Sequence, residues 1–211
     1  MHSPELEQTL TGGNMAGQVH RIGETVRRPT GPWTPAVHQV LHHLEQVGFR
    51  GAPRALGSDE QGREILTFIP GNMVHLRVLD DAGLTRVARL IRDYHAAVVS
   101  FMPPADAHWQ TDGRDPIGTG ELICHNDLAP WNLIVGEHEW AFIDWDLAAP
   151  GRRLWDLALA VCSFVPLWPD HTANLRRYRL FCASYGLSAA DVHELLDLVV
   201  QRTRRMAQVA R

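Results

Sequence analysis

Two short stretches of this 211-residue chain carry the side chains best suited to chemistry. The first runs from His125 to Asn132 and contains Asp127, and the second places Asp144 twelve residues further on. A carboxylate can orient a hydroxyl group and accept its proton, while carboxylate and carboxamide oxygens are ligands that Mg²⁺ accepts. The set could serve the transfer of a phosphoryl group from a nucleoside triphosphate, with Asp127 at the hydroxyl and Asn132 and Asp144 at the metal.

A predicted β-hairpin would bring these residues together. Two apolar runs, 133–135 and 140–143, are joined by a short polar turn. Asn132 comes just before the first run and Asp144 just after the second. We therefore expect both side chains at one end of the hairpin, close to Asp127, where they could reach the same metal ion.

The same residues also have a plainer interpretation. Aspartate and asparagine often cap turns or end strands without taking part in any reaction. For a single residue this is the better explanation. The complete set at these spacings would require several independent coincidences, so the pattern favours a site.

The pattern His-x-Asp-x-x-x-x-Asn from His125 to Asn132, followed by Ile143-Asp144-Trp145, resembles the catalytic loop and metal-binding segment of the aminoglycoside phosphotransferase family. These small-molecule kinases are related in fold to choline kinases and protein kinases. The resemblance implies an α+β, protein-kinase-like fold, with a small β-rich nucleotide-binding lobe over residues 1–70 and a mainly helical catalytic and substrate lobe over residues 71–211. It also implies a magnesium-dependent phosphotransferase that uses ATP or GTP and a small-molecule hydroxyl acceptor.

The resemblance assigns roles to individual residues. Asp127 and Asn132 are catalytic, and His125 supports their loop from within the site. Asp156 fixes its helix against the loop and is structural. Asp146 is either a contact to metal or substrate or a solvated turn residue.

Two further segments are expected to contact the nucleotide. Gly12, Gly13 and Asn14 lie between two predicted strands and resemble the phosphate-covering loop of kinases, in which small residues let backbone N–H groups approach the phosphates. Phe68 and Ile69 end a predicted strand just before a Pro-Gly hinge. By resemblance, their backbone would hydrogen-bond the edge of adenine.

The chain contains no lysine, and all 20 of its basic residues are arginine. Kinases hold the α- and β-phosphates with a strand lysine that a glutamate of the next helix positions. The corresponding strand carries Arg27 with Arg28 beside it, and the helix offers Val37 and His38 where the glutamate is sought. We expect Arg27 to neutralise phosphate charge, held by another acid, unless nucleotide binding is unusual here.

Helical signals fill most of the remaining chain. Thr34 is expected to cap one helix and Asp80 or Asp81 a second. A capping box at Ser188–Asp191 precedes the last helix. Two further helices are expected over residues 154–164 and 174–185.

Composition fits a compact enzyme, with 45% hydrophobic residues. A net charge of −4 without a long basic run argues against nucleic acid as a partner. No apolar run suits a membrane span, no signal-peptide pattern is present, and three widely spaced cysteines favour a cytoplasmic protein. The helix histidines His38 and His42 have a spacing that could share a metal, but exposed helix histidines are the better interpretation.

Two other functional classes remain open. A non-catalytic kinase-like protein that binds a ligand, for instance for self-protection (immunity), would suit the short chain and the absent lysine. A metal-dependent hydrolase could use the same carboxylates. The intact set of Asp127, Asn132 and Asp144 favours the phosphotransferase.

Overall fold

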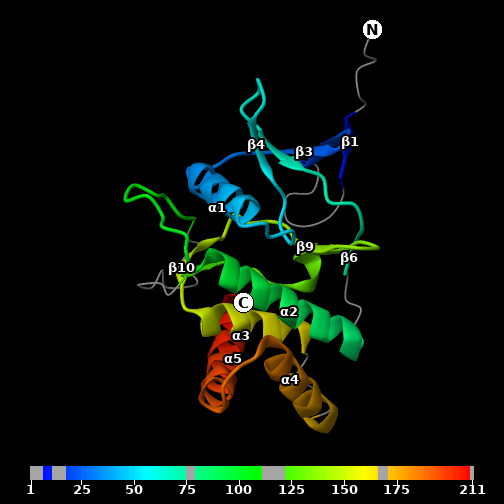
Figure 1. Ribbon diagram of the computed structural model, residues 1–211, viewed down its shortest axis with the longest axis vertical. Coiled ribbons are helices and arrows are strands. Elements are labelled where there is room, and N and C mark those ends of the chain that lie inside the picture. Colours follow the sequence, from blue (N-terminus) through cyan, green and yellow to red (C-terminus); the bar gives the residue numbers. More distant parts are fainter. Residues whose placement is uncertain (1–6, 11–17, 75–78, 111–121, 166–170, 210–211) are drawn as a thin grey trace.

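The computed structural model describes residues 7–10, 18–74, 79–110, 122–165 and 171–209. A β-sheet formed by the N-terminal part lies against a mainly helical C-terminal part (Figure 1). This sheet has five strands in the order β1-β2-β3-β5-β4, and every neighbouring pair is antiparallel. The strands are β1 Gln8–Thr9, β2 His20–Ile22, β3 Thr25–Arg28, β4 Ala55–Ser58 and β5 Glu64–Thr67. The predicted α+β arrangement is confirmed.

Helix α1 (Thr34–Gln46) packs beside this sheet and buries Val37, Val40, Leu41 and Leu44. The predicted cap at Thr34 is wrong, because the residue before it, Trp33, already has helical φ and ψ and makes no side-chain capping bond. The hydroxyl of Thr34 is buried and accepts a hydrogen bond from the N–H of residue 31 at 2.9 Å.

Among the described residues, the C-terminal part contains four α-helices and five short strands, which form one two-stranded and one three-stranded sheet. The predicted hairpin is confirmed, since Leu133 on β8 pairs with Phe142 on β9. Two strands were not predicted: β6 adds to the hairpin beside β8, and β10 pairs with β7. The elements are β6 Asn72–Met73, α2 Asp81–Val98, β7 Leu122–Cys124, the 3₁₀ turn Pro130–Asn132, β8 Leu133–Val135, β9 Trp140–Phe142, β10 Ala149–Gly151, α3 Arg153–Phe164, α4 His171–Tyr185 and α5 Ala189–Val209.

Two predicted helix starts are confirmed by capping bonds. The side chain of Asp80 accepts from the N–H of Gly83 at 2.8 Å ahead of α2. Before α5, the N–H of Asp191 donates to the hydroxyl of Ser188 at 3.2 Å, and the Asp191 carboxylate accepts from that hydroxyl at 2.9 Å. A side-chain acceptor of this kind satisfies N–H groups that the first turn leaves unpaired.

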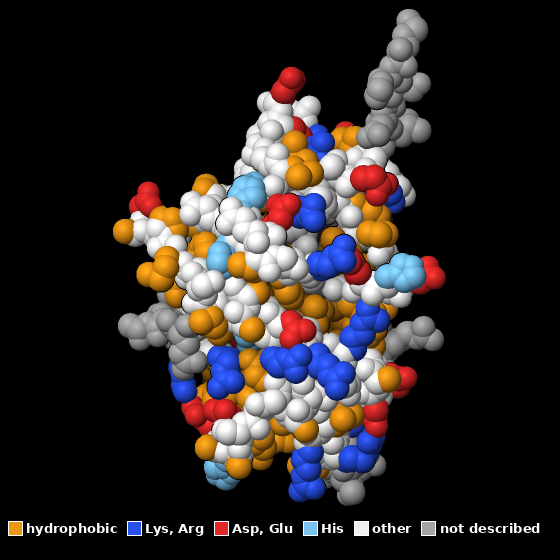
Figure 2. Space-filling view, in the orientation of Figure 1, with side chains coloured by type: hydrophobic (Ala, Val, Ile, Leu, Met, Phe, Trp, Pro, Cys, Tyr) orange, Lys and Arg blue, Asp and Glu red, His pale blue; other side chains and the backbone are white. Residues whose placement is uncertain are grey.

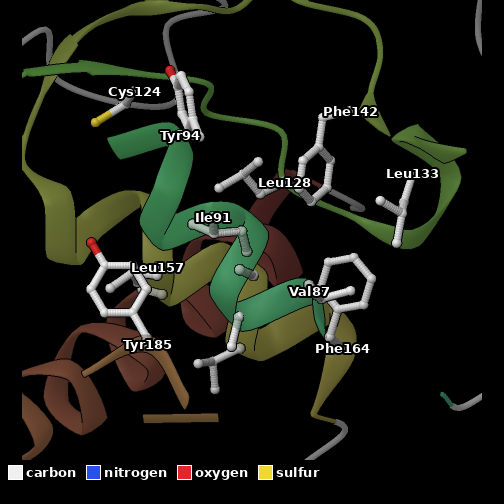
Figure 3. Packing of buried hydrophobic residues seen from close by; sticks show 14 of the residues in the cluster. Val87, Ile91, Tyr94, Cys124, Leu128, Leu133, Phe142, Leu157, Phe164 and Tyr185 are labelled. Atoms are coloured by element: carbon white, nitrogen blue, oxygen red, sulfur yellow. The ribbon is translucent and has the colours of Figure 1, made fainter. Parts of the chain in front are cut away.

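The core of the C-terminal part surrounds the predicted catalytic loop. Helix α2 crosses its centre and turns Val87, Ile91 and Tyr94 toward neighbouring side chains (Figure 3). Leu128, from the loop itself, is fully buried in this cluster. Burying a side chain of this size contributes about 1.5–3 kcal/mol, so the loop is anchored by packing as well as by hydrogen bonds.

Arginine and acidic side chains lie beside one another on the face drawn in Figure 2. Some of them join helices: Arg176 and Arg177 on α4 both pair with Asp81 at the start of α2, at 2.5 Å and 3.2 Å. These arginines therefore tie two helices together. Within the described part of the chain, no helix is both long and apolar enough to cross a membrane.

Candidate active site

A cavity of about 540 Å³ lies between the N-terminal sheet and the β8–β9 hairpin. Its walls come from β1, β3 and β5, from the segment that links the sheet to the helical part, and from the predicted catalytic loop and hairpin. The lining residues are Gln8, Thr9, Leu10, Val19, Val26, Arg28, Pro53, Leu66, Thr67, Phe68, Ile69, Gly71, Asn72, Met73, Trp131, Asn132, Ile134, Ile143 and Asp144. Mostly apolar walls with a few convergent polar groups are typical of a small-molecule site.

Asp127 and Asn132 are joined directly. The Asn132 amide nitrogen donates to the Asp127 Oδ2 atom at 2.7 Å and to the Asp127 backbone carbonyl at 3.1 Å. The indole N–H of Trp131 also points to Asp127 Oδ2, at 3.4 Å. Both side-chain contacts use the same oxygen of Asp127, so Oδ1 faces a different direction. The carboxylate also fixes the amide of Asn132, whose oxygen is left to face another ligand.

The hairpin brings Asp144 beside Asn132, as predicted. The N–H of Ile143 donates to the Asn132 carbonyl at 2.9 Å, and Asn132 and Asp144 both line the cavity. Asp144 has a left-handed backbone, with φ of 64°, and its side chain is 44% exposed. An accessible carboxylate and a carboxamide oxygen fit Mg²⁺, which takes few protein ligands when phosphates and water complete its shell.

Among the described side chains, no group of three or more His, Cys, Asp and Glu residues could hold a metal ion. A cation at Asn132 and Asp144 would therefore depend on ligands from the nucleotide. The helix histidines His38 and His42 have other partners. His42 is exposed, as expected, and bonds the carbonyl of Ala55, while His38 bonds Glu64.

His125 is fully buried and takes the supporting position that was predicted for it. Its Nε2 atom lies 3.2 Å from the carbonyl of Ile143, which can only accept, so this nitrogen carries the proton. Its Nδ1 atom accepts from the N–H of Asp127 at 3.3 Å. Burial lowers the pKa of His125, against the opposing charges of Asp156, Asp127 and Asp144, so the imidazole is neutral and links the loop to the hairpin.

Asp156 on α3 is buried and fixes the loop from below, as predicted. Its carboxylate accepts from the N–H groups of His125 and Asn126, both at 2.9 Å, and lies 3.1 Å from His95 Nε2 on α2. Burial alone would raise the pKa of Asp156, but the bonds from His95 and from the backbone outweigh it and hold that pKa below its usual value. One ionised carboxylate thus joins α2, α3 and the loop.

Arg28 is the basic residue at the cavity wall. Its guanidinium lies among three carboxylates, with Nε 2.9 Å from Glu64, Nη1 3.2 Å from Asp144 and Nη2 in close contact with Asp146. Burial opposes its charge, but the three carboxylates outweigh this and raise the pKa of Arg28. Burial is also the main cause that raises the pKa of Asp146. Its close contact with the guanidinium nevertheless makes Asp146 an ion-pair partner of Arg28 in this structure.

Arg27, which was expected to neutralise phosphate charge, does not line the cavity, whereas Arg28 does. Neighbouring residues of a strand point to opposite faces. Arg28 points to the cavity, while Arg27 bonds the hydroxyl of Thr25 at 2.6 Å and lies 3.9 Å from Asp59. The two arginines are alike in the sequence, and only the strand's face separates them. Alternation along β3 could have found Arg28 if the inward face had been fixed first by a buried neighbour.

The two nucleotide-contact segments have different outcomes. Phe68 and Ile69 both line the cavity, and the Arg21 guanidinium lies 3.7 Å above the centre of the Phe68 ring. Gly12, Gly13 and Asn14 lie outside the described residues.

The antiparallel sheet, the hairpin and the helical part together define a kinase-like fold. Residues 107–196 match the model of the phosphotransferase enzyme family. The chain is also 35% identical over 195 residues to the trifolitoxin immunity protein of Rhizobium leguminosarum bv. trifolii, covering 90% of this chain and 73% of that protein. The chain belongs to the phosphotransferase enzyme family.

Solved structures agree in fold. A microcompartment-associated aminopropanol kinase superposes with a TM-score of 0.68 at 14% identity, over 92% of this chain and 81% of the kinase. An amicoumacin kinase in complex with AMP-PNP and Ca²⁺ superposes with a TM-score of 0.65 at 10% identity, over 95% and 81% of the two chains. The predicted kinase-like fold is thereby confirmed.

Proposed function

We propose that the protein transfers the γ-phosphate of ATP or GTP to a hydroxyl of a small molecule. The observation that carries the proposal is that Asn132 connects Asp127 to the cavity. Asn132 lines the cavity together with Asp144, and its amide donates a 2.7 Å hydrogen bond to the carboxylate of Asp127. In this proposal residues 1–70 enclose the nucleotide, and residues 71–211 carry the catalytic loop and the acceptor site.

Asp127 would orient the acceptor hydroxyl. Its Oδ2 atom is occupied by Asn132 and Trp131, so Oδ1 would accept the hydroxyl proton as the oxygen attacks the γ-phosphorus. The bond between the γ-phosphorus and the β-phosphate oxygen would break, and the nucleoside diphosphate would leave. Catalysis would be alignment and charge stabilisation, without a covalent enzyme intermediate.

Asn132 and Asp144 would hold Mg²⁺ on the nucleotide phosphates. Bound there, the ion neutralises charge on the triphosphate. The related amicoumacin kinase, solved with AMP-PNP and Ca²⁺, supports the use of a nucleotide and a divalent cation. The backbone of Phe68 and Ile69 would bond the base, and Gly12, Gly13 and Asn14 would cover the phosphates.

A thermal-shift titration tests the nucleotide site. ATP and GTP are added with and without Mg²⁺ to the wild type, to Asp144→Ala and to the control Asp197→Ala, whose carboxylate is exposed on α5. A ligand at about 100 times its Kd stabilises the folded state by about 2.7 kcal/mol. The wild type and the control should show a magnesium-dependent rise in melting temperature that Asp144→Ala lacks. No rise at millimolar nucleotide would overturn the proposal.

A second candidate is self-protection without catalysis, and the similarity to the trifolitoxin immunity protein favours it. Asp127→Asn separates the two in a trifolitoxin-sensitive strain that expresses the chain. Protection that survives this change would indicate that the protein sequesters its ligand, and protection that is lost would indicate phosphoryl transfer. Phosphate release from ATP without an acceptor would indicate a hydrolase.

A further inference from the structure

The environment of Arg28 combines opposite charges at the cavity wall. Glu64 belongs to β5, while Asp144 and Asp146 follow β9, so the guanidinium joins the sheet to the hairpin. Arg28 is 7% exposed and Glu64 is 2% exposed. Three carboxylates around one arginine leave the cluster net negative, which favours a further cation beside Asp144.

The cluster continues into helix α1. His38 Nε2 lies 2.8 Å from one oxygen of Glu64, and the other oxygen of Glu64 lies 2.9 Å from Arg28 Nε. In kinases a glutamate of this helix pairs directly with the phosphate-binding lysine. Here α1 contributes His38 and β5 contributes Glu64. Two side chains therefore connect the helix to Arg28, where kinases use one glutamate.

We infer that Arg28 positions the nucleotide phosphates and that Glu64, supported by His38, holds its guanidinium for this task. The inference rests on the proposed function. An arginine has five N–H donors in a rigid fork. Nη1 donates to Asp144 and Nη2 donates to Asp146, while Nε lies 2.9 Å from Glu64 as an ion pair. One N–H on each terminal nitrogen is left for phosphate oxygens.

Such a residue affects anions and cations in opposite directions. Removing its charge takes a favourable partner away from the triphosphate and at the same time leaves Asp144 and Asp146 more attractive to a metal ion. A residue that only stabilises the fold would change both affinities in the same direction, through the folded fraction.

Calorimetry on Arg28→Met and on the matched control Arg27→Met tests this. The two variants lose the same charge from adjacent positions of β3 that face opposite sides. Arg28→Met should bind Mg-ATP about tenfold more weakly, which corresponds to about 1.4 kcal/mol. It should also bind Mn²⁺, used alone as the probe, more tightly than the wild type. Arg27→Met should match the wild type in both titrations.

Arg28→Lys covers the case in which Arg28→Met does not fold. It keeps the charge but cannot contact three carboxylates and phosphate at once. It should therefore bind Mn²⁺ like the wild type and Mg-ATP more weakly. Wild-type Mg-ATP affinity in Arg28→Met, or in Arg28→Lys if Arg28→Met does not fold, would overturn the inference and leave the proposed function standing. A wild type that binds no Mg-ATP would overturn both.

The support from α1 has its own pair of variants. His38→Phe breaks the contact to Glu64, while His42→Phe, one turn along α1, breaks only the bond to the Ala55 carbonyl. Mg-ATP affinity should fall in His38→Phe and not in His42→Phe, with Mn²⁺ affinity unchanged in both. Equal Mg-ATP affinities in the two variants would remove His38 from the assignment.

Discussion

The two halves of the candidate site are built differently. Asp127, Asn132 and Asp144 come from one continuous stretch, and a short hairpin brings them together. The Arg28 cluster joins side chains from β3, β5, α1 and the turn after β9. The first half could be assembled from spacing alone, while the second depends on which face of β3 is turned inward.

The continuous half nevertheless depends on distant residues. Asp156, about thirty positions along the chain, bonds the N–H groups of His125 and Asn126. His95, from α2, bonds the same carboxylate. Local spacing therefore determines which groups meet, and remote packing determines how firmly they are held.

The largest expected effect is at the centre of the continuous half. Asp127→Asn keeps the shape of the side chain and removes its ability to accept a proton, so turnover with an acceptor should fall by about 10²–10⁴-fold. The melting temperature should stay close to that of the wild type. Asp106→Asn, an exposed change of the same kind, is the control. Full activity in Asp127→Asn would separate this loop from the chemistry.

Removing Asp156, the remote support of the loop, should have an effect nearly as large in free energy. The effect should be a loss of folding stability and not of transition-state stabilisation. Asp156→Ala leaves two buried N–H groups and His95 without their acceptor, so the free energy of unfolding should fall by about 3–5 kcal/mol. Urea unfolding measures this, with the exposed Asp197→Ala as control. Equal midpoints for the two variants would show that the loop holds itself in place.

A smaller loss is expected from the Arg28 cluster. Glu64→Gln keeps the size of the side chain and removes the charge that faces Arg28 and His38. Since Arg28 retains Asp144 and Asp146, we expect a loss of about 1–3 kcal/mol in unfolding free energy. Glu60→Gln, in the exposed turn of the same hairpin, is the matched control. A loss as large as that of Asp156→Ala would mean that the Arg28 cluster depends on Glu64 as strongly as the catalytic loop depends on Asp156.

The smallest effect is a dependence on pH. Burial lowers the pKa of His125 from its usual 6.5, so the unfolded chain takes up a proton that the folded protein does not. Stability should therefore fall as the pH drops below about 6.5, by at most about 1.4 kcal/mol per pH unit for this group. Asp156 adds a loss at lower pH, since its depressed pKa gives stability above 3.8 that disappears as the pH falls through the folded value.

Urea unfolding at several pH values compares the wild type with His125→Gln and with the exposed control His42→Gln. The stability of His125→Gln should vary less with pH between about 7.5 and 5.5. Parallel curves for the wild type and His125→Gln would show that His125 does not contribute to the pH dependence.

The sequence predicted the hairpin, most helices and the meeting of Asp127, Asn132 and Asp144 because each rests on residues close together in the chain. Phe68 and Ile69 were assigned to the nucleotide by family resemblance, and both line the cavity. The sequence did not predict which side chains of different strands contact one another. Arg27 and Arg28 carry the same charge, so charge could not show which of them lines the cavity. The choice depends on which face of β3 is turned inward, and no local signal in the sequence fixed the pairing of β3 with β5.

Short additions to sheets were also missed. The strands β6 and β10 have two and three residues, too few for an alternating pattern, and they exist only because β8 and β7 offer open edges. The helix start at Trp33 shows a related limit. The hydroxyl of Thr34 could accept a hydrogen bond either from the first turn of α1 or from the N–H of residue 31, and it accepts the second.

The left-handed backbones of Asn126 and Asp144, each with φ of 64°, have an evolutionary consequence. Glycine adopts this conformation at no steric cost, so glycine at either position would relieve strain in the folded chain. In a library screened only for heat resistance, glycine should therefore be favoured at both positions. Its gain is balanced at 126 against the lost bond from Asn126 to the Leu147 carbonyl, and at 144 against the lost ion pair with Arg28. A library that must also bind nucleotide should keep aspartate at 144. Comparing the two populations would rank these positions by function without knowledge of the acceptor.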